Sequence, residues 1–152
     1  MAASDYSLAV LLRLIGAAEL AALAFVFAPV GWMDVVHDRF LGLGPLPPSP
    51  IVEYLARHLS ALYAVHGAII VGISMDVSRY RPLAVILGWG HVVLGLVLGW
   101  TDWSAGFSWV WALGEGTLVS CCGGLIVAFA HGRKPDPRQR HRPGDVGGSG
   151  RE

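Results

Sequence analysis

Long apolar runs alternate with short polar connections along this chain. Four runs stand out, and they cover residues 8–30, 51–73, 83–100 and 107–130. Each is close to the roughly 20 residues that an α-helix needs to cross a hydrocarbon core of about 30 Å. The third run, "LAVILGWGHVVLGLVLGW", lacks the charged face that a helix of a soluble bundle keeps. The pattern therefore predicts an all-α, integral membrane four-helix bundle in residues 1–131.

Composition supports this prediction. Of the 152 residues, 54% are hydrophobic and only 14% are charged, against about 25% charged in soluble domains. A cleaved signal peptide is the alternative interpretation of the first run. That run lacks a basic leader segment and contains Arg13 and Glu19, so a membrane span is the better interpretation.

The connecting segments predict the orientation. With four spans, both termini and the middle loop share one side, and Arg39 is the one basic residue on the other side. By the positive-inside rule the basic side is cytoplasmic, which places the protein in the cell membrane as a multi-pass protein. Its basic residues are Arg79, Arg81, Arg133, Lys134, Arg138, Arg140, Arg142 and Arg151. Tryptophans at the opposite boundary fit an aromatic belt: Trp32, Trp100, Trp103 and Trp109.

Two segments lie outside the spans. In residues 31–50, apolar positions recur at helical spacing before "PLPPSP", which predicts a short interfacial helix on the outer side. Residues 132–152, rich in Arg, Pro and Gly, predict a disordered basic cytoplasmic tail. The tail suits anionic lipid headgroups, and it lacks the aromatic residues that would stack on nucleic-acid bases.

Ionisable residues inside the spans are the candidate site. Counting about 1.5 Å per residue from the outer boundary places Arg57 roughly 9 Å deep, Glu115 roughly 13 Å and Glu19 roughly 15 Å. Because unpaired charges there cost on the order of 3 kcal/mol, we expect Glu19, Arg57 and Glu115 to form a buried ionic cluster. Glu53, one helical turn before Arg57, can join it. The cluster is open to two interpretations, an ionic lock between helices or a polar, proton-coupled site.

A second polar set is expected nearer the cytoplasm. Arg13, His66 and His91 lie roughly 8 to 13 Å from the inner boundary. Two neutral imidazoles on neighbouring helices could be axial ligands of a b-type haem, whereas a single histidine in a membrane more often makes one hydrogen bond.

Small residues predict which helix faces point inward, because they let neighbouring helices approach closely. They are Ser60, Ala64, Gly67, Gly88, Gly95, Gly99, Gly114 and Gly116. Cys121 and Cys122 are adjacent on one helix, so they face different directions and are expected to be unbridged, buried packing residues. Neither a catalytic motif nor a metal-binding motif such as His-Glu-x-x-His is found. The sequence therefore predicts no catalytic residue and no metal site.

The stretch "LLRLIGAAELAALAFVFAP", followed by three further spans, resembles the DoxX-like group of small four-helix membrane proteins. The matching positions are Arg13 and Gly16 in the first span. The resemblance implies a four-helix bundle and, in some members, association with respiratory or redox membrane complexes.

The function predicted from the sequence is that of a non-catalytic membrane subunit, or of a membrane protein that binds a small molecule or lipid. A bis-histidine haem electron carrier and an oligomeric proton-coupled transporter are the alternatives. The expected partners are the bilayer and either a second copy of the chain or a membrane complex, with no role for nucleic acid. Small-residue faces would suit a homodimer.

Overall fold

A computed structural model describes residues 3–132, and this part of the chain consists of helices joined by turns and loops, with no strand. The long helices are α1 (Ala3–Leu20), α4 (Pro50–Met75), α5 (Arg81–Ser104) and α6 (Trp109–His131). The stretch Ser4–Phe27 and the helices α4, α5 and α6 are each long and apolar enough to cross a membrane. This confirms the predicted all-α class and the four apolar helices.

The first apolar run is not one continuous helix. Helix α1 ends at Leu20, a turn follows at residues 21–22, and the short helix α2 (Leu23–Phe27) completes the run before Pro29. The backbone hydrogen bond from Ala22 to the Glu19 carbonyl, 3.0 Å long, spans three residues rather than four. The helical path therefore changes just beyond Glu19.

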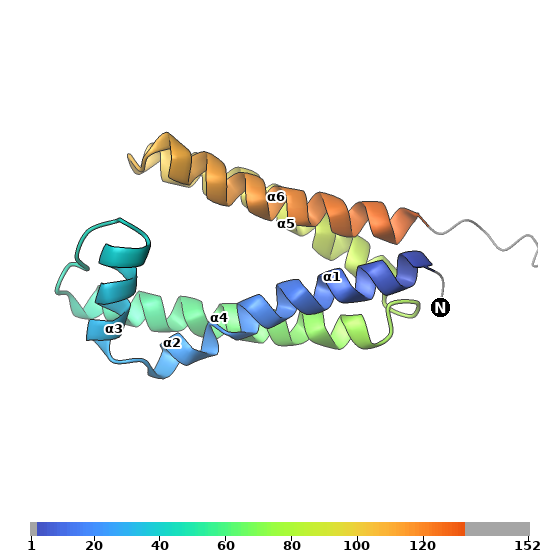
Figure 1. The fold of residues 1–152 in the computed structure, drawn as a ribbon, viewed down its shortest axis with the longest axis horizontal. Helices are drawn as coiled ribbons and strands as arrows, with labels where there is room; N and C mark the ends of the chain where they lie inside the picture. Colours follow the sequence, from blue (N-terminus) through green and yellow to red (C-terminus); the bar gives the residue numbers. More distant parts are fainter. Residues whose placement is uncertain (1–2, 133–152) are drawn as a thin grey trace, which may run out of the picture.

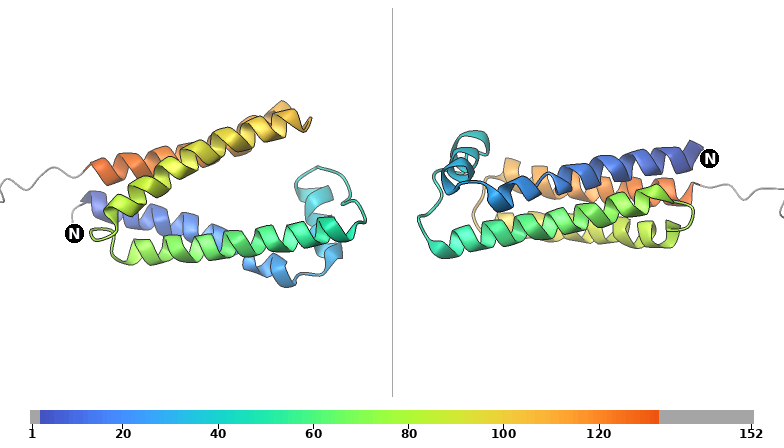
Figure 2. Two further views of the ribbon diagram at one scale, coloured as in Figure 1. Left: turned by 180° about the vertical axis from the view of Figure 1, so that it is seen from behind. Right: turned by 90° about the horizontal axis from the view of Figure 1, so that it is seen from below.

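The long helices form two hairpins that diverge like the arms of a V (Figures 1 and 2). Helices α1 and α2 pack along α4, and α5 packs along α6. The main contact between the hairpins joins α1 to α6. The arms meet near the N-terminus and separate towards the end that carries α3 (Val30–Val35), which is the open end of the V (Figure 1).

Close glycine contacts hold each hairpin together. A Cβ atom at Gly67 in α4 would lie 2.6 Å from the Gly16 carbonyl oxygen of α1, and one at Gly116 in α6 would lie 2.6 Å from the Gly95 carbonyl oxygen of α5. A side chain at either position would separate the helices. The small residues thus mark packed faces, as predicted, but Gly114 has nothing within 4 Å of its Cβ position and is not one of them.

The closed end of the V has an apolar core and a buried ion pair. Leu8 and Leu12 of α1, Ile70 of α4 and Ile126 of α6 are fully buried there. Beside them the Arg81 guanidinium donates to the carboxylate of Asp5, which is 3% exposed, and to the Ala130 carbonyl oxygen at 2.5 Å. This pair ties α1, α5 and α6 together. The sequence had placed Arg81 simply among the loop cations.

The segment between α2 and α4 is partly helical, as predicted. Helix α3 continues into a wider, π-type turn, η1 (Val36–Phe40), and together they run crosswise to the long helices (Figure 1). The Asp34 carboxylate accepts a hydrogen bond from the Leu46 amide at 2.7 Å, which folds the following loop back. Asp34 therefore anchors the connection. The predicted tail, residues 132–152, lies outside the described residues except for Gly132.

Candidate functional site

Three ionisable side chains from three helices converge between the hairpins. The Glu19 carboxylate of α1 bonds His66 Nδ1 of α4 at 2.6 Å, and its other oxygen lies 3.5 Å from His91 Nε2 of α5. The two imidazole rings are stacked, with centroids 5.5 Å apart. The sequence had predicted these residues as members of two separate sets, so their meeting is a finding of the tertiary structure.

His91 is the most enclosed member of this triad. Its side chain is 6% exposed, against 16% for Glu19 and 39% for His66. The His91 Nδ1 atom lies 2.9 Å from the Leu87 carbonyl oxygen, one turn earlier in α5. A carbonyl oxygen can only accept, so Nδ1 carries a proton, and when the ring is neutral Nε2 presents a lone pair. Nε2 is buried and has no hydrogen-bond partner.

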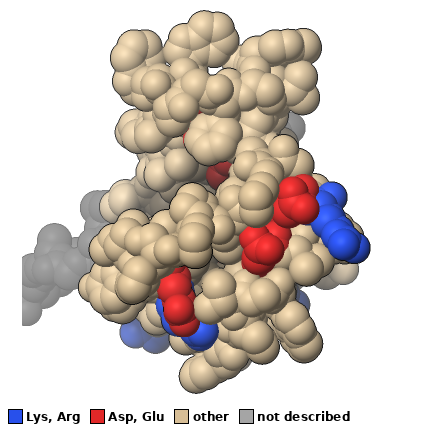
Figure 3. All heavy atoms as spheres, turned by 90° about the vertical axis from the view of Figure 1, so that its left-hand side faces the viewer, with Lys and Arg blue, Asp and Glu red and all other residues tan. Residues whose placement is uncertain are grey.

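The triad borders a cavity of about 450 Å³ between the hairpins. All four long helices contribute to its largely apolar wall, including Leu94 and Leu98 of α5 and Leu118 of α6. Glu115 lines the same cavity from α6, and Tyr63 lines it from α4. Seen from the open end of the V, a notch separates two lobes, and charged atoms gather on the lower lobe, whereas the upper lobe of α5 and α6 carries almost none (Figure 3).

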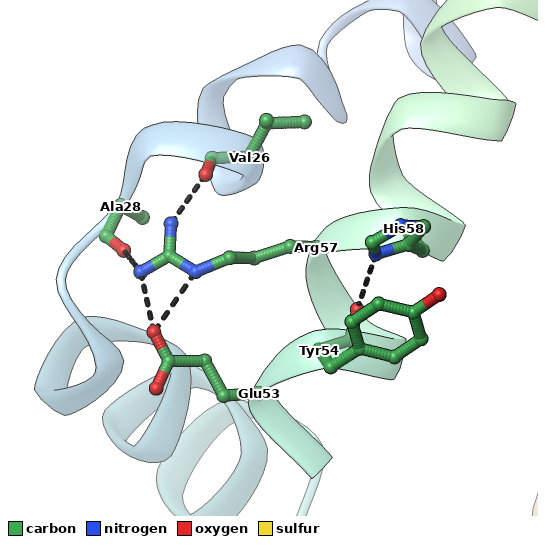
Figure 4. Close-up of polar contacts among 6 residues, drawn as sticks. All are labelled: Val26, Ala28, Glu53, Tyr54, Arg57 and His58. Atoms are coloured by element: carbon green, nitrogen blue, oxygen red, sulfur yellow. Dashed lines mark hydrogen bonds and ion pairs between the residues drawn. The ribbon is translucent and has the colours of Figure 1, made fainter. Parts of the chain in front are cut away.

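Arg57 does not join Glu19 and Glu115, so the predicted three-residue cluster is wrong. Its guanidinium donates instead to the carbonyl oxygens of Val26 and Ala28, the latter at 3.1 Å (Figure 4). These carbonyls lie at the C-terminal end of α2, where Pro29 stops the helix and leaves them without backbone partners. Depth along the helix predicted a carboxylate partner for Arg57, but nearby backbone acceptors take that place.

The predicted pairing of Arg57 with Glu53 is confirmed. The Arg57 Nε atom donates to Glu53 at 3.0 Å, and a second nitrogen lies 2.9 Å from the same oxygen (Figure 4). His58, the next residue, points elsewhere and bonds the Tyr54 carbonyl at 2.9 Å. Glu53 and Arg57 therefore form a separate polar group that holds α2 against α4.

Of the predicted inner set, the structure unites the two histidines but not Arg13. Arg13 is exposed on α1, beside a shallow hollow that it shares with Asp5 and Tyr6. The expected separation of the cysteines is confirmed: both thiols are free, and Cys122 lines the central cavity. Cys121 is exposed, so the prediction that both are buried is wrong for it.

A haem does not fit between His66 and His91 as they are placed. Axial histidines point their nitrogens at one iron from opposite sides of a porphyrin plane. Here the two rings are stacked with their planes 28° from parallel, and one carboxylate lies within 3.5 Å of a nitrogen of each ring. A porphyrin between them would have to displace Glu19 and separate the rings.

Glu115 belongs to the site although Arg57, its predicted partner, lies elsewhere. Among the ion pairs of residues 3–132, none involves Glu115. The cavity lining contains two carboxylates, Glu19 and Glu115, and no arginine or lysine. The site as a whole is therefore acidic and suits a cation or a hydrogen-bond donor.

Sequence reasoning missed two features of this region. The pairing of Glu19 with both histidines had one available signal, since their estimated depths differ by only a few ångströms. The Asp5–Arg81 pair had none, because Asp5 precedes the predicted span and Arg81 begins the third helix.

Comparison of the chain with protein-family models, curated proteins and solved structures finds no match.

Proposed function

We propose that this chain is a four-span integral membrane protein with cytoplasmic termini, and that the cavity between its hairpins binds a small cationic ligand. Mean hydropathy over the four candidate spans is between 1.5 and 2.1. Large apolar side chains face outward on these helices, including Leu14, Leu62, Ile86 and Leu96, each at least 66% exposed. Lipid tails would cover such surfaces, whereas water would not tolerate so large an apolar area.

The single observation that carries the binding function is the convergence of ionisable side chains on the cavity. Glu19, His66, His91 and Glu115 converge on one space of about 450 Å³ in an otherwise apolar setting. An apolar pocket with a few converging polar groups is the usual form of a small-molecule site. Ionisable groups at mid-membrane depth are costly, so they are typically kept for binding or transport.

A purely structural ionic lock accounts less well for this arrangement. In a lock each buried charge is matched by a partner, because one unmatched partner costs several kcal/mol. Here Glu115 has no ion pair among the described residues, and His91 Nε2 has no hydrogen-bond partner. The polar set is open on its cavity side, which favours a ligand. A role as a non-catalytic subunit, in the manner that the DoxX-like resemblance implies, is compatible with this proposal.

The binding function is tested by thermal unfolding of the protein in lipid nanodiscs, with a panel of divalent cations and primary amines. We expect at least one class to raise the melting temperature of the wild type. The increase should disappear in Glu19→Gln and fall in Glu115→Gln, but persist in Glu53→Gln, whose carboxylate lies outside the cavity. A panel without effect on the wild type, or an effect unchanged by Glu19→Gln, would contradict the proposal.

The orientation is tested separately by labelling single cysteines in intact cells. Ser78, in the loop between α4 and α5, and Ser108, at the start of α6, are placed on opposite sides by the proposal. A variant that lacks Cys121 and Cys122 provides the background. A membrane-impermeant maleimide should label Ser108→Cys and should not label Ser78→Cys until the cells are opened. The reverse pattern would invert the proposed topology.

A further inference from the structure

His91 Nε2 and one carboxylate oxygen of Glu19 face each other across a short gap. The Leu87 carbonyl holds a proton on His91 Nδ1, and Nε2 lies 3.5 Å from the carboxylate oxygen. When the ring is neutral both atoms are acceptors, which repel each other at that distance unless a proton or a metal cation lies between them. The His91 side chain is 6% exposed, so water has little access to the gap.

A third ligand atom lies beside this gap. One nitrogen of His66, one of His91 and one oxygen of Glu19 all lie within 4.8 Å of one another. Ligands that share a tetrahedral Zn²⁺ at bond lengths of about 2.0 to 2.2 Å are separated by about 3.4 Å. The 3.5 Å between Glu19 and His91 already matches this spacing. Glu19 and His66 Nδ1 are 2.6 Å apart, so a small side-chain shift would have to separate them before both could bind one metal ion in place of the shared proton.

The surroundings of the triad have the features of a metal site. Metal-bound histidines usually donate their other ring N–H to a carbonyl or carboxylate, as His91 does to Leu87. Two imidazoles and one carboxylate suit zinc, iron(II) and neighbouring transition metals, and leave further coordination positions open. Those positions would face the cavity of about 450 Å³, on the side where Glu115 lies.

We infer that Glu19, His66 and His91 bind one divalent first-row transition-metal ion, with open coordination positions towards the cavity. This inference rests on the proposed binding function, and it specifies the class of ligand that binds where the three side chains meet. Glu19 and His66 belong to the α1–α4 hairpin and His91 to the α5–α6 hairpin, so the ion joins the two arms of the V. Glu115, on the open side, adds negative charge that favours entry of a cation.

The test uses Co²⁺, whose visible absorption reports its ligands, on full-length protein in nanodiscs after treatment with EDTA. We expect one equivalent to bind per chain. Glu19→Gln and His91→Gln should weaken binding by about 100-fold or more. Two matched controls, Glu53→Gln and His58→Gln, remove the same chemical groups from α4 outside the cavity and should leave affinity unchanged.

His91→Cys keeps the test decisive if loss of a ligand prevents folding. A thiolate is itself a ligand, and its bond to Co²⁺ should add a sulfur-to-metal charge-transfer band that the wild type lacks. The inference is overturned if Co²⁺ and Zn²⁺ do not bind, or if Glu19→Gln and His91→Gln both bind as the wild type does. It is also overturned if His58→Gln weakens binding as much as His91→Gln does. Failure of both metals to bind, while a primary amine still stabilises the wild type through Glu19, would reject the metal and leave the binding function standing.

Discussion

The carboxylate of Glu19 in α1 accepts a hydrogen bond from Nδ1 of His66 in α4 at 2.6 Å. The same carboxylate faces His91 of the other hairpin. Glu19 is therefore the residue through which the two arms of the V meet at the central cavity. This relationship gives the site its chemistry and distinguishes it from the polar groups that only hold the fold.

Glu19→Ala should destabilise the protein by about 1 to 3 kcal/mol, because it removes the acceptor of the His66 Nδ1 hydrogen bond between α1 and α4. Glu53→Ala removes a carboxylate whose side chain is 43% exposed and should cost about 0.5 kcal/mol or less. Unfolding by SDS in mixed micelles measures both free energies. Equal effects of the two substitutions would show that Glu19 has no special structural role.

Arg57→Ala should loosen α2 without affecting ligand or Co²⁺ binding in the cavity. The substitution frees the carbonyls of Val26 and Ala28, and Arg57→Lys should not restore both contacts because an ammonium lacks the planar fork. Faster amide hydrogen exchange in residues 23–35 is the expected readout. Loss of Co²⁺ binding in Arg57→Ala would instead return Arg57 to the site, as the sequence had suggested.

Arg81→Ala should be strongly destabilising, by about 3 to 5 kcal/mol, because it leaves Asp5 buried without its ion-pair partner. Arg79→Ala is the matched control, since the Arg79 guanidinium only lies 5.6 Å from the Tyr80 ring centroid, and it should cost no more than about 1 kcal/mol. Asp5→Asn together with Arg81→Ala should recover part of the loss. Thermal unfolding in nanodiscs gives the ranking, and indistinguishable arginine variants would contradict a structural role for the pair.

Gly116→Ala should separate α5 from α6 and destabilise the protein by about 1 to 3 kcal/mol, since its Cβ would lie 2.6 Å from the Gly95 carbonyl oxygen. Gly114→Ala, in the same helix, meets nothing within 4 Å and should be neutral or stabilising by up to about 1 kcal/mol. The free energy of unfolding in mixed micelles distinguishes the two. A tolerated Gly116→Ala would mean that the hairpin is not held by close glycine packing.

Much of the fold could be predicted because it depends on local properties of the chain. The four apolar runs match the four candidate membrane spans to within a few residues, and Pro29 and Pro50 mark where helical segments end or begin. Glycine spacing identified Gly67, Gly95 and Gly116 as packing positions. The break after Leu20 was missed, since residues 21–22 are alanines and give no signal for a turn.

The candidate site could be predicted only in part. Counting residues along a helix gives the depth of a side chain, but not the direction in which the folded bundle turns it. Depth grouped Glu19 and Glu115 with Arg57 and placed His66 and His91 in a separate, inner set. It could not show that the carbonyls at the end of α2 would occupy the Arg57 guanidinium.

By itself, the sequence determined that this protein is helical, how long and how apolar its helices are, and which of their faces are small enough to pack closely. These features follow from composition and from the helical repeat, which act over a few turns of one segment. Only the tertiary structure decided that α1 pairs with α4 and α5 with α6, that the pairs diverge, and that Glu19 meets His66 and His91. The physical reason is that partner choice depends on the rotation and tilt of each helix, and these are set by close glycine contacts between segments far apart in the chain.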